Sequence, residues 1–110
     1  MSTFNGNGTR PRVNGVSNHQ TISWLVDTGA VRSCMPTKVF RRMFPQGKRP
    51  KKLAEQIKLF GASGTELGFQ GVYLMPITIM NKTVEFPVVV CDKLNECILG
   101  IEFQHKHGLR

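Results

Sequence analysis

Trp24-Leu25-Val26-Asp27-Thr28-Gly29-Ala30, continuing into Val31-Arg32-Ser33-Cys34-Met35-Pro36, is the stretch around which the fold is organised. An apolar run delivers a single carboxylate, that of Asp27, into a Thr-Gly turn, and a second short hydrophobic segment follows. Asp-Thr-Gly on its own often makes only an Asx turn. The apolar lead-in argues for more, because a carboxylate with buried surroundings is costly without a partner.

The same carboxylate from a second chain is one such partner. Two carboxyl groups ~3 Å apart share one proton, because like charges that close cannot both ionise. One carboxylate then acts as a base towards a water molecule, while the protonated one polarises a carbonyl group. A lone Asp27 in this setting therefore favours an acid/base site that two copies of the chain complete by symmetry.

Composition indicates one small domain that spans residues 1–110. A hydrophobic content of 40% and a charged content of 20% are typical of a globular chain, and Gly 11 and Pro 6 indicate many turns. We therefore expect a mainly β domain. Met1 to Thr9 is rich in Gly, Asn, Ser and Thr, which predicts a flexible arm. No apolar run approaches the ~20 residues of a membrane span, and Met1–Arg10 lacks the apolar core of a secretory signal, so we expect no membrane partner and no secretion.

The cysteines argue for reduced thiols rather than disulfides or a metal site. Cys34, Cys91 and Cys97 are odd in number and form no recognisable framework, which is typical of an intracellular protein. Cys91, Cys97, His105 and His107 could be combined as four metal ligands, but they lack paired C-x2-C spacing and Cys97 falls inside an apolar run. We therefore predict no metal and no cofactor.

A basic segment from Arg41 to Lys52 supplies much of the net charge of +8. Its cations fall within a dozen residues: Arg41, Arg42, Lys48, Arg49, Lys51 and Lys52. Dense Lys/Arg runs can bind phosphate backbones, so a nucleic-acid partner is one hypothesis. With Phe40 and Phe44 as the only interleaved aromatic residues and no nucleic-acid-binding motif, the sequence favours the alternative, a solvated loop face.

Alternation and turn residues predict a series of strands with one helix at the end. The predicted strands are Arg12–Val16, Thr21–Val26, Gln56–Phe60, Thr65–Phe69, Gly71–Met80, Val84–Val90 and Cys97–Gly100. Pro76 predicts an edge or a bulge, and Gly61-Ala62-Ser63-Gly64 predicts a pliable hairpin tip. Pro36–Phe44 is predicted to form a short helical turn or loop, and Ile101–His107 a helix capped by Gly108.

These features, in this order, resemble the retropepsins, the dimeric aspartic proteases of retroviruses and gypsy-like retrotransposons. Leu25-Val26-Asp27-Thr28-Gly29-Ala30 is similar to the active-site motif, the Gly61–Gly64 hairpin to the flap, and Ile98-Leu99-Gly100 to the hydrophobic-hydrophobic-Gly signature. Ile101–His107 matches the single helix that follows. The resemblance covers about Arg10 to Gly108 and implies a closed β-barrel of the acid-protease fold with one short C-terminal helix, forming half of a two-fold symmetric dimer.

The resemblance implies a role for each matching residue. Asp27 would be the catalytic carboxylate, Thr28 would hydrogen-bond across the dimer axis, and Gly29 would present a backbone carbonyl to the substrate. A flap would close over an extended peptide, and side-chain pockets would prefer apolar residues beside the scissile bond. The implied flap residues are Phe60, Gly61, Ala62, Ser63 and Gly64, and the implied pocket residues are Leu25, Ala30, Leu94 and Ile98.

The chain departs from the retroviral pattern in two places. Several retroviral members carry an Asp after the motif's Ala and an Arg after the later Gly, which form a buried ion pair, whereas this chain has Val31 and Ile101. We therefore predict an apolar contact there, with Glu102 where gypsy-like members often have Asp. Retroviral members also continue beyond the terminal helix into an interleaved strand, whereas this sequence stops at Leu109-Arg110, which predicts a weaker dimer or one held differently.

Three functions of different classes follow. The first is a homodimeric aspartic endopeptidase that processes a Gag-Pol-like polyprotein in the cytoplasm or in a virus-like particle. A cellular retropepsin-like protease attached to a ubiquitin-related domain would share this chemistry. The second is a catalytically silent domain of the same fold that dimerises or binds peptides, against which the intact Asp27-Thr28-Gly29 argues. The third is the basic nucleic-acid-binding module.

Overall fold

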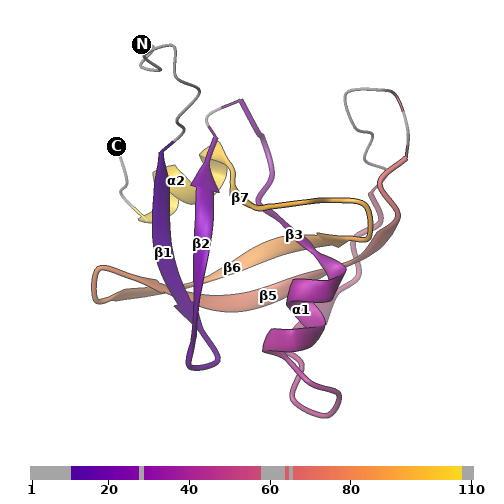
Figure 1. Cartoon of the computed structure of the whole chain (residues 1–110), viewed down its shortest axis with the longest axis horizontal. Coiled ribbons are helices and arrows are strands. Elements are labelled where there is room, and N and C mark those ends of the chain that lie inside the picture. The colour runs from indigo at the N-terminus through magenta and orange to yellow at the C-terminus, as the bar shows by residue number, and fades with distance from the viewer. Residues whose placement is uncertain (1–10, 28, 58–63, 65, 108–110) are drawn as a thin grey trace.

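In the residues that the structure describes, the chain folds into a closed β-barrel with two short helices (Figure 1). The computed structural model describes residues 11–27, 29–57, 64 and 66–107. Its elements, in chain order, are β1 (Arg12–Ser17), β2 (Gln20–Val26), β3 (Cys34–Pro36), α1 (Thr37–Met43), β4 (Lys51–Leu53), β5 (Phe69–Ile79), β6 (Lys82–Cys91), β7 (Cys97–Leu99) and α2 (Ile101–His107).

Six strands close the barrel and a seventh lies beside it. The order β1-β2-β7-β3-β6-β5 returns to β1 through the pairing of Val16 with Thr78. β4 pairs with the first half of β5, at Lys51 to Leu74, and so lies outside the ring. The predicted mainly β, closed-barrel fold class is confirmed, together with the C-terminal helix Ile101–His107.

Two tight hairpins set the strand register. Asn18 and His19 connect β1 to β2 with φ of 49° and 63°, and Met80 and Asn81 connect β5 to β6 with φ of 51° and 67°. Turns with two positive φ angles match the right-handed twist of the flanking strands.

Pro76 lies within β5 but is not the site of a bulge, so that alternative was wrong. It pairs in register with Glu85, and the irregularity falls instead between Phe69 and Gly71. On the other edge of β5, Pro76 stands between Leu74, which pairs with β4, and Thr78, which pairs with β1. The missing N–H of proline is tolerated in this gap, and the Pro76 carbonyl accepts a hydrogen bond from Ser17 Oγ at 2.5 Å.

The segment before β5 differs from the prediction. Gln56 and Ile57, the described part of the predicted strand Gln56–Phe60, are not in a strand, and residues 58–60 lie outside the described residues. In the predicted strand Thr65–Phe69, Glu66 forms only an isolated bridge and regular pairing starts at Phe69. The strand in this region is β4, because Lys51–Leu53 find partners in β5 that local propensity does not reveal.

Alternating residues of β6 divide the interior into two clusters. Val88 and Val90 face the main core, where Trp24, Met35 and Phe103 are fully buried. Val89 and Cys91 point to the opposite face and form a second cluster. The second cluster also contains buried Val72 and the partly buried Cys34, Leu53, Ile57, Leu67, Phe69 and Leu94.

Both helices are fastened to this core. α1 confirms the helical alternative predicted for Pro36–Phe44, and it buries Phe40 and Met43. α2 buries Phe103, whose ring meets Phe86 edge-on with 5.0 Å between centroids. No helix in the described part of the chain is long and apolar enough to span a membrane.

Candidate active site

Asp27 sits where β2 leaves the barrel sheet. Its backbone N–H donates to the Leu99 carbonyl at 3.1 Å, which continues the parallel pairing of β2 with β7 by one residue. Its side chain is half-buried. The strand pairing therefore holds the backbone of Asp27 in place while the carboxylate reaches beyond the strand end.

The turn after Asp27 is held by the aspartate itself. The Gly29 N–H donates to Asp27 Oδ1 at 2.9 Å, and the Ala30 N–H donates to the Asp27 carbonyl at 3.1 Å. A Cβ on residue 29 would lie 3.2 Å from Asp27 Oδ1, which is closer than side chains usually approach. The turn thus orients one carboxylate oxygen and leaves Oδ2 without a hydrogen bond to any described residue.

β7 lies between the two strands that enter and leave this loop. It pairs with β2 in parallel and with β3 at Cys34 to Ile98. Directly after β7, the Ile101 N–H donates to the Ala30 carbonyl at 2.9 Å. The two ends of the loop between β2 and β3 are therefore held by pairing with opposite edges of β7.

Gly100 is the contact point between the loop and α2. A Cβ here would lie 2.7 Å from the Ala30 carbonyl oxygen and 2.8 Å from that of Arg32, both backbone atoms that cannot rotate away. The Gly100 N–H donates to Ser33 Oγ at 3.0 Å, and Ser33 is fully buried. The glycine of the Ile98-Leu99-Gly100 signature is thus required by the close approach of the loop backbone.

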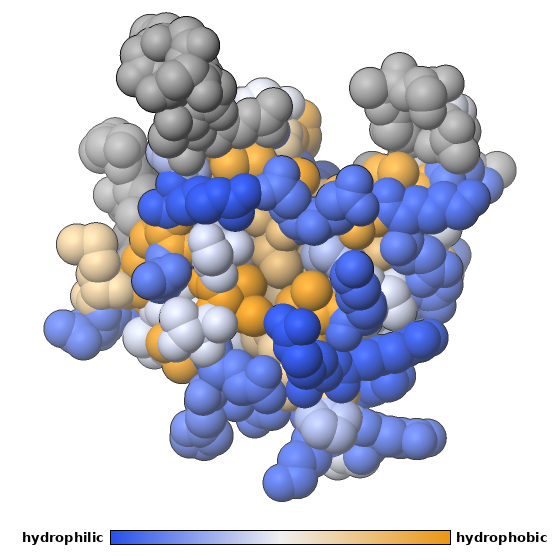
Figure 2. Space-filling view, viewed as in Figure 1, coloured by the Kyte–Doolittle hydropathy of each residue, from blue (hydrophilic) through white to orange (hydrophobic). Residues whose placement is uncertain are grey.

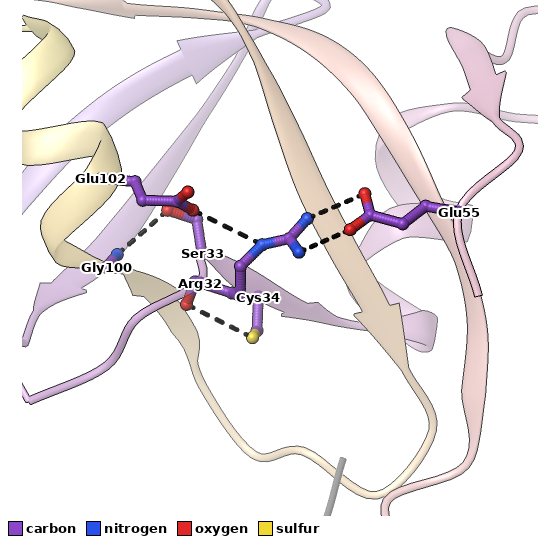
Figure 3. Close-up of polar contacts among 6 residues, drawn as sticks. All are labelled: Arg32, Ser33, Cys34, Glu55, Gly100 and Glu102. Atoms are coloured by element: carbon purple, nitrogen blue, oxygen red, sulfur yellow. Dashed lines mark hydrogen bonds and ion pairs between the residues drawn. The ribbon is translucent and has the colours of Figure 1, made fainter. Parts of the chain in front are cut away.

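Arg32 joins the loop to two distant segments (Figure 3). Its guanidinium donates to both oxygens of Glu55, with Nη1–Oε2 at 2.7 Å and Nη2–Oε1 at 3.1 Å. Arg32 Nε lies 3.4 Å from Glu102 Oε1 on α2, an ion pair without an aligned hydrogen bond. The Glu55 hydrogen bond raises the pKa of Arg32, and the same bond lowers the pKa of the exposed Glu55 carboxyl.

This ion pair replaces the contact predicted between Val31 and Ile101. The Val31 side chain is 67% exposed, so an apolar contact with Ile101 is not what joins these segments, and that prediction was wrong. The charged residues one position further on, Arg32 and Glu102, make the connection instead. The retroviral order of charges is reversed here, with the cation on the loop and the carboxylate on the helix.

The remaining predicted site residues lie in different settings. Leu25 is buried at 1% exposure, whereas Ala30, Leu94 and Ile98 are half-buried. Gly64 is exposed with a φ of 84°. Thr28 and the flap residues Phe60, Gly61, Ala62 and Ser63 lie outside the described residues.

A groove of about 280 Å³ lies away from Asp27. It runs between β1, β2, α1 and the segment before β7, and its lining includes Arg12, Arg42, Glu96 and Val39. A cleft shared between two chains would not show as a pocket in one of them, so the position of this groove does not argue against Asp27.

The three thiols are all unpaired. Burial raises the pKa of Cys34 to about 11 and the pKa of Cys91 and Cys97 to about 12, so all three are protonated at neutral pH. In the described part of the chain, no three His, Cys, Asp or Glu side chains are grouped as metal ligands.

A barrel whose strand end presents an Asp-Thr-Gly turn beside a Leu-Gly strand defines the class of aspartic proteases of the retropepsin type. The family model of gag-polyprotein putative aspartyl proteases matches residues 13–105, and the chain belongs to this family. Among solved structures the chain is similar to the EIAV protease complexed with the inhibitor HBY-793, with a TM-score of 0.78. The two share 22% identity over 99% of this chain and 97% of that chain, and the likeness shows the fold. No curated protein sequence matches the chain.

The sequence did not reveal the Arg32–Glu55 pair or the Ser33–Gly100 hydrogen bond. The partners in each are far apart in the chain, and only the closed barrel brings them together. The sequence offers one signal for the Arg32–Glu55 pair, which is charge. Arg32 is the first cation after Asp27, and Glu55 is the next carboxylate along the chain.

Proposed function

We propose that this chain is one subunit of a homodimeric aspartic endopeptidase whose catalytic dyad consists of Asp27 from each copy. The observation that supports the proposal is that the Asp27 carboxylate is held in position but has no side-chain partner among the described residues. Its backbone is fixed at the strand end and its Oδ1 by Gly29, yet no described side chain hydrogen-bonds to its carboxylate. A second copy supplies the missing group.

In the proposed dimer the two carboxyl groups share one proton. The ionised carboxylate takes a proton from a water molecule as its oxygen attacks the scissile carbonyl carbon, and the protonated one donates its proton to the carbonyl oxygen. The resulting tetrahedral diol collapses when the newly protonated carboxyl gives its proton to the amide nitrogen, the ionised carboxylate takes a hydroxyl proton from the diol, and the C–N bond breaks, which restores the shared proton. The backbone bonds of Asp27 and Gly29 keep the carboxylate from rotating during these steps.

The substrate we propose is an extended peptide segment of a Gag-Pol-like polyprotein. The matching family model is described for gag-polyprotein proteases, which supports this substrate class. Ala30, Leu94 and Ile98 are half-buried apolar residues and so offer surface to apolar side chains on both sides of the scissile bond. Leu25 is buried and is the strand partner of Ile98, and we propose that residues 60–64 cover the bound peptide.

Replacement of Asp27 by Asn tests this function, because Asn keeps the size and one hydrogen-bond acceptor for the Gly29 N–H but cannot ionise. We expect peptide cleavage to fall by about 10²–10⁴-fold or more while the fold is unchanged. A matched control is Asp92→Asn, a carboxylate that bonds Thr37 and Gln70 away from the loop. Undiminished cleavage by pure Asp27→Asn protein would contradict the mechanism.

A transition-state-analogue inhibitor of aspartic proteases separates an enzyme from a silent domain of the same fold. The wild-type chain should cleave peptides and lose this activity in the presence of the inhibitor. Inhibitor binding without cleavage at any concentration of the chain would favour the silent peptide-binding domain.

A further inference from the structure

A second surface of the molecule, unrelated to Asp27, carries a concentration of positive charge. No Asp or Glu occurs between Asp27 and Glu55. The exposed cations of α1, of the loop after it and of β4 form what we call the basic face. Its members are Lys38, Arg41, Arg42, Lys48, Arg49 and Lys52. Lys51 is not a member, because side chains alternate along β4 and Lys51 points with Leu53 to the other side of the sheet.

Packing joins these residues although three elements carry them. Lys38, Arg41 and Arg42 have the i, i+3, i+4 spacing that places side chains on one side of α1. Phe40 of the same helix lies under the Arg49 guanidinium, 5.5 Å from the ring centre, and its ring is 4.4 Å from that of Tyr73. Tyr73 in turn is the strand partner of Lys52. In Figure 2 strongly hydrophilic residues cover the region where Figure 1 shows α1.

These cations are not neutralised within the chain. Among the described residues, none of the cations of the basic face takes part in an ion pair, whereas Arg12 pairs with Glu96 and Arg32 with Glu55 and Glu102. Glu96 also lines the groove at Arg42, so this end of the face has one carboxylate neighbour. Each of the other cations is exposed, and no ion pair with another described residue neutralises it.

We propose that the basic face binds the phosphate backbone of nucleic acid without reading its sequence. Binding of this kind needs only a dense set of unpaired Lys and Arg, since the release of condensed counterions supplies the free energy. Phe40, Phe44 and Tyr73 are buried, so no aromatic side chain of this face can stack on a base. Recognition is therefore confined to the backbone.

An acidic protein fits this surface less well. Protein interfaces have an apolar core within a polar rim. In the described residues the exposed large apolar side chains are Val16, Val31 and Met80, and none of them belongs to the basic face. Interfaces with nucleic acid lack this requirement, because they are more polar and strongly positive.

The test uses the Asp27→Asn chain, so that its outcome does not depend on proteolysis. Binding of a labelled single-stranded RNA of mixed sequence is measured over a range of salt concentrations. Lys38→Glu/Lys52→Glu reverses two charges of the basic face, and Lys93→Glu/Lys106→Glu reverses two exposed lysines elsewhere. Both double variants lower the net charge of the Asp27→Asn chain by the same four units.

We expect the Lys38/Lys52 variant to lose about tenfold or more in affinity and to show a shallower salt dependence, by up to about two in the log–log slope, while the Lys93/Lys106 variant stays close to the parent chain. Equal losses in the two variants would overturn the proposal, because net charge alone would then explain binding. Tighter binding to polyglutamate, or to vesicles of phosphatidylcholine and phosphatidylserine, than to RNA would also overturn it.

Discussion

The guanidinium of Arg32 donates two hydrogen bonds to the carboxylate of Glu55, at 2.7 Å and 3.1 Å. Arg32 lies in the loop that follows Asp27, and Glu55 follows β4, so the pair joins the candidate active site to the segment after the extra strand. The opposite side of the same guanidinium meets Glu102 of α2. One side chain thus links three parts of the fold that are remote in sequence (Figure 3).

The Arg32–Glu55 pair should make the folding stability of the chain depend on pH in the acid range. The hydrogen bond from Arg32 lowers the pKa of Glu55 below its usual 4.5 in the folded chain. As the pH falls, Glu55 is therefore protonated in the unfolded chain before it is protonated in the folded chain. The stabilisation from the Arg32–Glu55 pair is complete above a pH of about 4.5, and it is lost as the pH drops through the lower pKa that Glu55 has in the folded chain. We expect Glu55→Gln to lose thermal stability near neutral pH and to approach the wild-type Tm in acid.

Tm measured from neutral pH to below the usual pKa of glutamate checks this prediction. Glu66→Gln, at an exposed glutamate without a recorded ion pair in the described structure, is the matched control. A constant difference in Tm between Glu55→Gln and the wild-type chain across this pH range would show that the Arg32 pair does not titrate as expected.

Gly100→Ala should be among the most damaging single substitutions in the described part of the chain. Its Cβ would meet the carbonyl oxygens of Ala30 and Arg32 at 2.7 and 2.8 Å, so the loop after Asp27 must move. We expect a loss of about 2–4 kcal/mol in the free energy of unfolding and a large fall in peptidase activity. Denaturant unfolding measures the first and a peptide assay the second.

Gly47→Ala provides the contrast. Gly47 has a φ of 95° but no atom within 4 Å of its would-be Cβ, so alanine there should cost only about 1 kcal/mol of backbone strain. Equal effects of the two substitutions would mean that the close approach at Gly100 is not important for the loop.

Ser33→Ala should weaken the same junction through a lost hydrogen bond. Ser33 Oγ accepts the Gly100 N–H at 3.0 Å inside the protein, and alanine leaves that N–H unpaired and buried. We expect about 1–3 kcal/mol of destabilisation by denaturant unfolding. Ser23→Ala, at an exposed serine of β2, should leave the free energy of unfolding nearly unchanged. An equal destabilisation by Ser23→Ala would show that the lost Ser33–Gly100 hydrogen bond does not explain the effect of Ser33→Ala.

The thiols should be almost inert in the folded chain. Burial raises the pKa of Cys34 to about 11 and that of Cys91 and Cys97 to about 12, so little thiolate is present at neutral pH. A thiol-reactive chromophore should therefore react slowly with the native chain and rapidly in denaturant. One fast-reacting thiol in the native chain would contradict the burial described for these residues.

The strands with strong local patterns were predictable, and those made by tertiary pairing were not. β1, β2, β5, β6 and β7 follow β-branched or alternating runs that identify them from sequence, and their predicted positions are confirmed within two residues at each end. β4 is Lys51-Lys52-Leu53, which has no strand propensity, and it exists because β5 offers an open edge. The lysines also suit an edge strand, since charge discourages further pairing.

The residues of the candidate site likewise fall into those that the sequence predicted and those that only the folded structure reveals. The carboxylate of Asp27 and the glycine at 100 belong to short motifs, so the sequence pointed to both. Arg32, Glu55 and Ser33 belong to no motif, and their contacts depend on how the barrel closes. The prediction at Val31 and Ile101 was wrong because Val31 is largely exposed and the connection is made one residue further along each segment, by Arg32 and Glu102.

The most direct test of the shared dyad mixes wild-type chains with Asp27→Asn chains. The two chains are mixed while dissociated and then brought to a total concentration well above the range in which dimers dissociate, so that subunits pair at random. Peptidase activity is followed as the wild-type fraction decreases. If each site needs Asp27 from both copies, activity will fall as the square of the wild-type fraction, so equal parts will give one quarter of the full rate. A linear decline, with one half of the rate at equal parts, would show that a single Asp27 suffices and would contradict the account.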